Sequence, residues 1–286
     1  MQDTRETLDM EELLRFYAEA GVDMPLSETP IDRFAAPQRP APTQKAAPIT
    51  SLSETVRPSR EPRAAAIPSP ASRPVQAAAD LPDNAQIALA REAASQATTL
   101  EELRERLAAY DGCNLKFTAK NLCFADGDPS SDIMFVGEAP GRDEDIEGLP
   151  FVGKSGQLLN RMIEAIGLKR ESVYIANTIP WRPPGNRTPT PLETELCRPF
   201  IERQIELATP KVLVALGGPA GKALTGASEG ILRLRGNWKV HRTPSGMEIP
   251  VMPTLHPAYL LRTPAQKRFA WRDFLAVKMK LAELED

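Results

Sequence analysis

Ile133-Met-Phe-Val-Gly-Glu-Ala-Pro-Gly141 is the stretch that decides how this chain of 286 residues folds. Its first four residues form a short apolar run, which predicts a buried strand. The chain then passes through a loop of glycine and proline that carries Glu138, and a helical pattern begins at Ser155. Glycine lets the backbone approach a ligand closely, and a helix N-terminus favours negative charge. The stretch therefore predicts a ligand site at the end of a buried strand.

Strands and helices alternate after this stretch. Further strands are expected at 173–177, 211–216 and 249–254, and helices at 155–166 and 190–207. This alternation predicts an α/β fold, namely a three-layer α/β/α domain with a central, mostly parallel, four-stranded sheet.

The expected sheet brings polar residues to one edge. Ligands of such sheets bind beyond the carboxyl ends of the strands. We therefore expect Glu138, Asn177, Gly217 and the residues after Thr254 to surround one crevice. Residues 238–242 are expected to form a hairpin or a paired strand with the last of the four strands.

The N-terminal part has a different composition from the rest. Residues 1–35 are acidic, and the apolar spacing at 7–20 predicts a short amphipathic helix. Residues 36–82 contain ten prolines and many alanines, and no aromatic residue. Such a segment buries too little apolar area to offset its chain entropy, which predicts a disordered linker. The folded domain is therefore expected at 83–286, and the acidic segment either binds a partner or docks on the domain.

Charge and cysteine content limit the class of protein. The net charge is −3, but residues 233–272 hold eight basic residues and one acidic residue. Such a stretch either binds a phosphate backbone or is a solvated face. The three cysteines include no Cys-x2-Cys pair and the sequence has no long apolar run, and from the acidic N-terminal residues we expect no signal peptide. A soluble, cytoplasmic protein is the expectation.

Three side chains near the expected crevice can carry chemistry. His256 follows the strand 249–254 and is one of two histidines, so it is either functional or a satisfied structural residue. The amide of Asn177 can read an edge with N–H beside C=O, as in uracil, although turns also favour asparagine. Phe151 lies in a glycine-rich loop, where it is either a platform for a flat ligand or a staple against the next helix.

A set of short motifs spans about residues 110–280. They are Gly137-Glu-Ala-Pro-Gly141, Glu144-Asp145, Gly148-Leu-Pro-Phe-Val-Gly153, Gly156-Gln-Leu-Leu159, Asn177, Arg182-Pro-Pro-Gly-Asn-Arg187 and His256-Pro-Ala-Tyr-Leu-Leu-Arg262. Together they resemble the uracil-DNA glycosylase superfamily, and its family 4 most closely.

The resemblance implies an enzyme that flips deoxyuridine out of DNA and hydrolyses its N-glycosidic bond, which starts base excision repair. By this resemblance Glu138 orients the attacking water, His256 stabilises the leaving uracil, Phe151 stacks on the base and Asn177 reads its polar edge. The physical chemistry agrees, since the base leaves as an anion and the sugar becomes cation-like. The further substrate-binding residues are Ala139 and Glu144.

The resemblance also implies how the protein meets its partners. The substrate is uracil-containing DNA, single- or double-stranded, and the expected state is a monomer with no membrane contact. A repair or replication protein is the expected partner of residues 1–35. Leu260 or Leu261 is expected to fill the gap that a flipped base leaves. The residues expected to contact DNA are Arg182, Arg187, Tyr259, Leu260, Arg262, Lys267 and Arg268.

The sequence departs from family 4 at the four-cysteine iron–sulfur cluster. The first expected pair is reduced to Cys113-Asn-Leu-Lys116, and Trp181 stands where the third cysteine is expected. Only Cys113 and Cys197 remain, and two thiolates cannot hold a four-iron cluster. We therefore expect no cofactor and no metal. A related branch bonds covalently to DNA through a histidine in the loop that is 179–190 here; this loop contains no histidine, which favours turnover.

Two other functions remain open at the level of sequence. One is a glycosylase of wider range that also takes hypoxanthine or xanthine, which Glu138 and Asn177 do not exclude. The other is a non-catalytic accessory of a polymerase that binds single-stranded DNA, which needs the basic stretch but neither Glu138 nor His256.

Overall fold

The computed structural model describes residues 83–285. The expectations for 1–35 and 36–82 lie outside the described residues. Within 83–285, no helix is long and apolar enough to cross a membrane.

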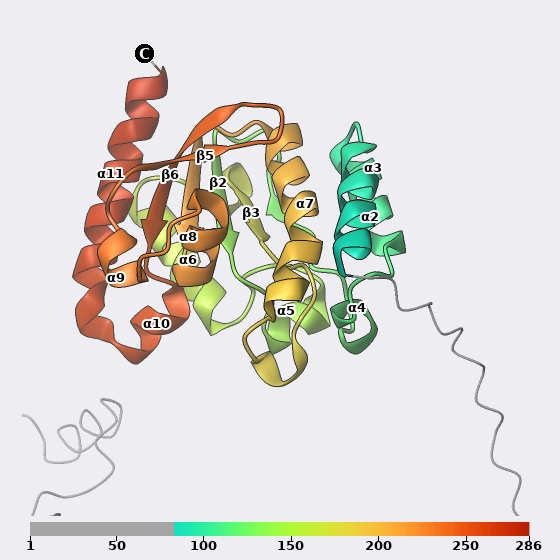
Figure 1. Ribbon diagram of the computed structural model, residues 1–286. Coiled ribbons are helices and arrows are strands. Elements are labelled where there is room, and N and C mark those ends of the chain that lie inside the picture. The colour runs from blue at the N-terminus through green and yellow to red at the C-terminus, as the bar shows by residue number, and fades with distance from the viewer. Residues whose placement is uncertain (1–82, 286) are drawn as a thin grey trace, which may run out of the picture. The chain divides into compact units, whose positions relative to one another are not determined.

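A mixed sheet forms the centre of the domain (Figure 1). It has six strands in the order β1-β3-β2-β4-β6-β5, so the expected number of four was wrong. The two additional strands lie at the edges and are antiparallel to their neighbours; one of them, β5, is the strand expected at 238–242, and it pairs with β6 as expected. The strands are β1 (Asp126–Gly127), β2 (Ile133–Gly137), β3 (Tyr174–Asn177), β4 (Val212–Leu216), β5 (Lys239–Arg242) and β6 (Glu248–Thr254).

The four central strands are parallel, as expected, and their register decides where the site lies. Gly137 of β2 pairs with Asn177 of β3, and Leu216 of β4 pairs with Thr254 of β6. The carboxyl ends of all four strands therefore meet at one edge of the sheet. Every residue of β2, β3 and β4 is buried, which explains why these strands are continuous apolar runs.

Helices cover both faces of the sheet, which confirms the three layers. On one face, α6 and α11 pack their apolar side chains on Phe135, Val214 and Met252. On the other face, α7 and α8 pack on Val136 and Leu213. The longer helices are α2 (Asp83–Ser95), α3 (Leu100–Ala109), α6 (Lys154–Ala165), α7 (Pro191–Ala208), α8 (Gly218–Thr225) and α11 (Lys267–Glu285).

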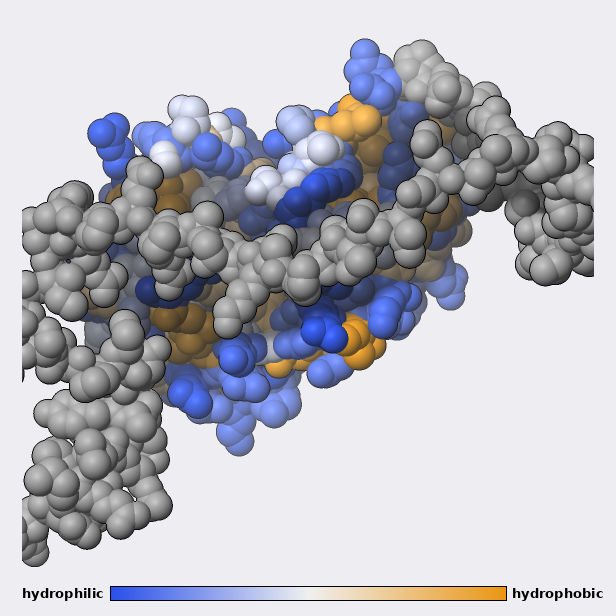
Figure 2. Space-filling model, turned by 90° about the horizontal axis from the view of Figure 1, so that it is seen from below, coloured by the Kyte–Doolittle hydropathy of each residue, from blue (hydrophilic) through white to orange (hydrophobic). Residues whose placement is uncertain are grey.

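Short helices near the strand ends were not expected from the sequence, because they are too short to show a 3.6-residue periodicity. The loop after β2 contains α5, and α10 begins immediately after His256. In Figure 2, which views the molecule from below Figure 1, the visible surface is mostly hydrophilic with smaller hydrophobic groups between. The short helices are α4 (Leu115–Thr118), α5 (Arg142–Glu147), α9 (Ile231–Leu234), α10 (Pro257–Arg262) and the 3₁₀ helices η1 (Arg170–Ser172), η2 (Pro184–Asn186) and η3 (Pro264–Gln266).

Candidate active site

A cavity of about 490 Å³ opens at the carboxyl ends of β2, β3, β4 and β6. It lies where the sequence predicts the crevice. Residues at or after the ends of all four strands line it. The predicted site residues that line it are Glu138, Ala139, Glu144, Phe151, Asn177, Arg187, His256, Tyr259 and Arg262.

Gly137 makes room for two of these side chains. A Cβ atom at this position would lie 2.4 Å from Oδ1 of Asn177 and 2.6 Å from the ring of Phe151. Both distances are shorter than real contacts, so any other residue would displace the amide, the ring or both. The glycine at the end of β2 therefore lets Asn177 and Phe151 meet across the end of the sheet.

Phe151 is buried and adopts a left-handed backbone conformation, with φ of 54°. This conformation costs a residue other than glycine about 1–3 kcal/mol, so the surrounding structure must hold it. The ring centroid of Phe151 lies 5.6 Å from that of His256, with 31° between the planes. The strain thus accompanies an aromatic ring that faces the cavity next to the histidine.

The carboxylate of Glu144 holds two loops together. It accepts hydrogen bonds from the backbone N–H groups of Gly141 at 3.1 Å, Val152 at 3.1 Å and Gly153 at 3.0 Å. Glu144 therefore joins the loop after β2 to the loop that carries Phe151. It lines the cavity, but its carboxylate oxygens already accept three backbone hydrogen bonds. A contact of Glu144 with substrate stays a prediction.

The imidazole of His256 is a neutral hydrogen-bond donor. Burial, together with the positive charge of Arg262, lowers the pKa of His256 to about 4, so the ring is uncharged at neutral pH. Its Nδ1 accepts a hydrogen bond from the backbone N–H of Ala258 at 3.1 Å. Since Nδ1 accepts, the single ring proton must be on Nε2. Nε2 can therefore donate a hydrogen bond to a ligand without carrying a charge.

Glu138 combines a fixed backbone with an unpaired side chain. Its carbonyl oxygen accepts hydrogen bonds from Oγ1 of Thr178 at 2.8 Å and from the N–H of Ile179 at 3.0 Å. Burial raises the pKa of the carboxyl group above its ordinary value. No hydrogen bond or ion pair with another residue of 83–285 holds this carboxylate. It is thus available to a water molecule or to a developing positive charge.

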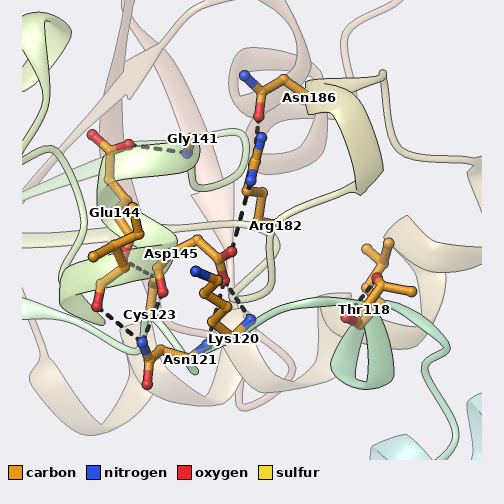
Figure 3. A network of polar contacts seen from close by, with 11 residues as sticks. Thr118, Lys120, Asn121, Cys123, Gly141, Glu144, Asp145, Arg182 and Asn186 are labelled. Carbon is orange, nitrogen blue, oxygen red and sulfur yellow. Dashed lines mark hydrogen bonds and ion pairs between the residues drawn. The ribbon is translucent and has the colours of Figure 1, made fainter.

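A polar network supports the rim of the cavity (Figure 3). The buried carboxylate of Asp145 accepts hydrogen bonds from the N–H groups of Lys120 at 2.7 Å and Asn121 at 3.3 Å. Its other oxygen lies 3.8 Å from Nη1 of Arg182, whose Nε donates to Asn186 at 2.7 Å. Arg182 therefore lies behind the rim, where it orders the loop that follows β3.

The other residues expected to contact DNA fall into two groups. Arg187 lines the cavity and pairs with Glu193 at 2.6 Å, while Lys267 and Arg268 are exposed outside it. Leu260 is 1% exposed and packs in the core, so in this conformation it cannot contact DNA. Its neighbour Leu261, the alternative from the sequence, is 44% exposed.

The positions of the expected iron–sulfur ligands form part of an apolar core. Cys113, Cys197 and Trp181 are buried in one hydrophobic cluster beneath α2 and α3. Nζ of Lys116 pairs with Asp111 at 2.5 Å. Within 83–285, no group of three or more histidine, cysteine or acidic residues is arranged to hold a metal ion. The residues present therefore do not fit a four-cysteine cluster.

Sequence reasoning missed part of the cavity wall. Ser155, Asn186, Thr188 and Pro219 also line it, although they lie in loops or at the first turns of helices. Asn186 lies within the motif 182–187 and Ser155 begins the helix expected at 155–166, but the residue types at these four positions do not by themselves indicate a site.

The fold and the cavity define an α/β protein with a pocket at the ends of its parallel strands that is lined by an aromatic ring, an amide, a carboxylate and an imidazole. The chain belongs to the uracil DNA glycosylase superfamily, whose sequence profile matches residues 124–275. A curated relative from Thermotoga maritima, named type-4 uracil-DNA glycosylase, is 41% identical over 167 residues, which are 57% of this chain and 83% of the relative.

Two further relatives carry the same name. The one from Archaeoglobus fulgidus is 39% identical over 181 residues, covering 62% of this chain and 90% of the relative. The one from Sulfurisphaera tokodaii is 38% identical over 188 residues, covering 63% of this chain and 84% of the relative.

Proposed function

We infer that the protein is a DNA repair glycosylase that removes uracil from DNA by hydrolysis of the N-glycosidic bond. The observation that carries this inference is the joint presence of Glu138, Phe151, Asn177 and His256 around one cavity. The relatives named type-4 uracil-DNA glycosylase support the same substrate and reaction. The enzyme is a monofunctional hydrolase, and it acts on DNA.

The proposed roles follow from the chemistry of each group. The ring of Phe151 stacks on the flipped base, and the amide of Asn177 pairs with the uracil edge that presents N–H beside C=O. The Nε2–H of His256 donates to a uracil oxygen, where negative charge develops as the bond breaks. Glu138 orients the attacking water and stabilises the cation-like sugar. Each role needs only groups that already face the cavity.

Release of uracil from DNA tests the proposal directly. The protein is incubated with a single-stranded and a double-stranded oligonucleotide that each contain one uracil, without added metal, and alkali then cleaves any abasic site. We expect strand cleavage at the uracil position. Binding of the oligonucleotide without cleavage would instead identify a non-catalytic DNA-binding protein.

The reading of the base by Asn177 is tested with Asn177→Asp. Aspartate replaces amide donors by acceptors, which repel the uracil carbonyl and suit the amino group of cytosine. A mismatched buried polar group can cost about 10⁴ in discrimination. We therefore expect Asn177→Asp to lose most of its uracil release. Oligonucleotides that contain hypoxanthine or xanthine are assayed in the same way, to test whether the enzyme has a wider substrate range. Uracil release at the wild-type rate would remove this role from Asn177.

We propose that the enzyme works without an iron–sulfur cluster. This proposal is supported by Trp181 and Lys116 at two of the expected ligand positions and by the packing of the two remaining cysteines. The purified protein is expected to be colourless, and elemental analysis is expected to find no iron. A brown protein with about four irons per chain would refute it. A monomeric state, a cytoplasmic location and a repair or replication partner of residues 1–35 are also parts of the proposal.

A further inference from the structure

Arg170 holds the loop of Phe151 from outside the cavity. It begins η1, which leads into β3, and its guanidinium reaches back to the chain before α6. Nη2 donates to the carbonyl oxygen of Pro150 at 2.7 Å, and Nη1 donates to that of Phe151 at 3.0 Å. One side chain therefore holds two consecutive carbonyl groups of the loop.

The guanidinium is in turn fixed on its far side. Nη1 also donates to Oδ1 of Asn160 on α6 at 2.8 Å, and Nε donates to Oδ2 of Asp126 on β1 at 2.8 Å. The ion pair with Asp126 has an N···O distance of 2.6 Å. The side chain of Arg170 is 19% exposed. It is thus a half-buried clamp that joins β1, η1 and α6 to the loop.

The hydrogen bond from Arg170 to the carbonyl of Phe151 is made to the residue of the site that has a strained backbone. With φ of 54°, Phe151 turns its carbonyl group against the first turn of α6, where a Cβ atom on Gly156 would lie 1.7 Å from that oxygen. Only glycine at 156 leaves room for the carbonyl, and Arg170 supplies its donor. A carbonyl group turned inward without a donor would be unfavourable. The left-handed conformation and the arginine are therefore coupled.

We propose that Arg170 is a positioning residue of the enzyme, which fixes the ring of Phe151 beside His256. This inference rests on the proposed function, in which Phe151 stacks on uracil. Arg170 does not line the cavity and acts only through Phe151. The planar guanidinium is suited to the task, because it donates in several fixed directions at once, whereas a lysine ammonium cannot reproduce that fork.

A double-mutant cycle tests the proposal. Single-turnover release of uracil is measured for wild type, Arg170→Gln, Phe151→Ala and the double variant. A small misplacement of a positioned group can cost about 10²-fold in rate. We expect Arg170→Gln to slow release by about 10- to 100-fold in the wild-type background and by less than about twofold in the Phe151→Ala background. Equal losses in both backgrounds would overturn the proposal.

Two further measurements separate positioning from a general structural role. The affinity for abasic-site DNA is expected to stay within about twofold of wild type in Arg170→Gln, since the rim residues are untouched, while inhibition by free uracil weakens. Arg170→Lys keeps the charge and one donor, so its rate is expected between those of wild type and Arg170→Gln. It replaces Arg170→Gln in the cycle if the latter does not fold. Arg104→Gln, an exposed position on α3, is the matched control and is expected to behave as wild type.

The outcomes distinguish this inference from the proposed function. A wild-type protein that releases no uracil removes the proposed function and the inference with it. An active wild type together with Arg170→Gln at the wild-type rate removes the inference alone. A lower melting temperature of Arg170→Gln with a normal rate also counts against it, because it shows a role in stability only.

Discussion

His256 is a neutral donor in this site, and this state has consequences for rate and for pH. Loss of one donor to a developing oxyanion typically costs about 10²–10³ in rate. We expect His256→Ala to lose that much in single-turnover release of uracil, while binding to uracil-containing DNA is retained. The measurement is a pair of single-turnover and equilibrium-binding titrations. A wild-type rate in the variant would mean that another group stabilises the leaving base.

The pH dependence checks the same assignment. An ordinary histidine, with a pKa of 6.5, would become charged as the pH falls below neutrality, but the pKa of His256 is about 4. Titration of His256 should therefore not change the wild-type rate near pH 6.5. Any change in rate near this pH should also be present in His256→Ala. Such a step would show that the ring titrates and that the neutral tautomer is not the working form.

Glu138 is expected to increase the rate at a cost in stability. Burial raises the pKa of its carboxyl group above 4.5, so the folded state disfavours the charge. The stabilising contribution of a raised pKa is present below the unfolded-state value and is lost as the pH rises through the folded-state value. Glu138→Gln, which stays uncharged, should therefore be more stable than wild type at neutral pH, and the difference should vanish in acid.

The same variant should be a poor enzyme, since positioned acid–base groups typically contribute about 10²–10⁴ in rate. Thermal unfolding at neutral and acidic pH, together with the single-turnover rate, gives both quantities. A variant that is less stable at neutral pH would show that the carboxylate has a favourable partner. Glu138→Ala is the comparison that separates loss of charge from loss of packing.

Some of these residues could be found from the sequence and others could not. Glu138 and His256 follow apolar strands and Asn177 ends one, and parallel strands bring such positions to one edge. Arg170 could not be found, because its main partners are the backbone carbonyl groups of Pro150 and Phe151, which leave no trace in the residue types.

At the scale of the elements, the two leucines of α10, Leu260 and Leu261, lie on different sides of the helix. Leu260 is buried against the core, and Leu261 is 44% exposed on the same short helix. An apolar side chain inserted into the base stack compensates for the flipped base in a duplex, whereas a single strand has no stack to fill. Leu261 is therefore the candidate wedge.

We expect Leu261→Ala to slow release from duplex DNA by about tenfold, which corresponds to ~1.4 kcal/mol, and to leave release from single-stranded DNA nearly unchanged. Leu260→Ala, by contrast, should lower the free energy of unfolding by about 2–5 kcal/mol through a cavity in the core. Single-turnover rates on both substrates and thermal melts of both variants make the comparison. Equal slowing on duplex and single strand by Leu261→Ala would exclude the wedge.

The long helices are among the elements that sequence patterns predicted. The helix expected at 155–166 is α6 at Lys154–Ala165, and the one expected at 190–207 is α7 at Pro191–Ala208, whose cap is a hydrogen bond from the N–H of Glu193 to Oγ1 of Thr190. β1 has two residues and α5 has six, which is too short for a periodic pattern. These short elements depend on tertiary contacts.

At the scale of the whole molecule, the hydrophobic core and the candidate site can both be located within residues 83–285. The hydrophobic clusters on the two faces of the sheet and beneath α2 and α3 draw all their buried residues from between Ala90 and Val277. The cavity is lined from between Glu138 and Arg262.

Removal of residues 1–80 should therefore leave catalysis intact. A chain that begins near Asp80 is expected to fold with an unchanged melting temperature and to release uracil from a single-stranded oligonucleotide within about twofold of the full-length rate. The measurements are a thermal melt and single-turnover release for both chains, with a chain that begins at Leu100 as the control, since it lacks α2 and with it Ala90 and Ala94 of the core. That control should lose stability. A chain from Asp80 that folds but no longer releases uracil would show that the N-terminal segment contributes to the site, because the core would then be intact and only the chemistry lost.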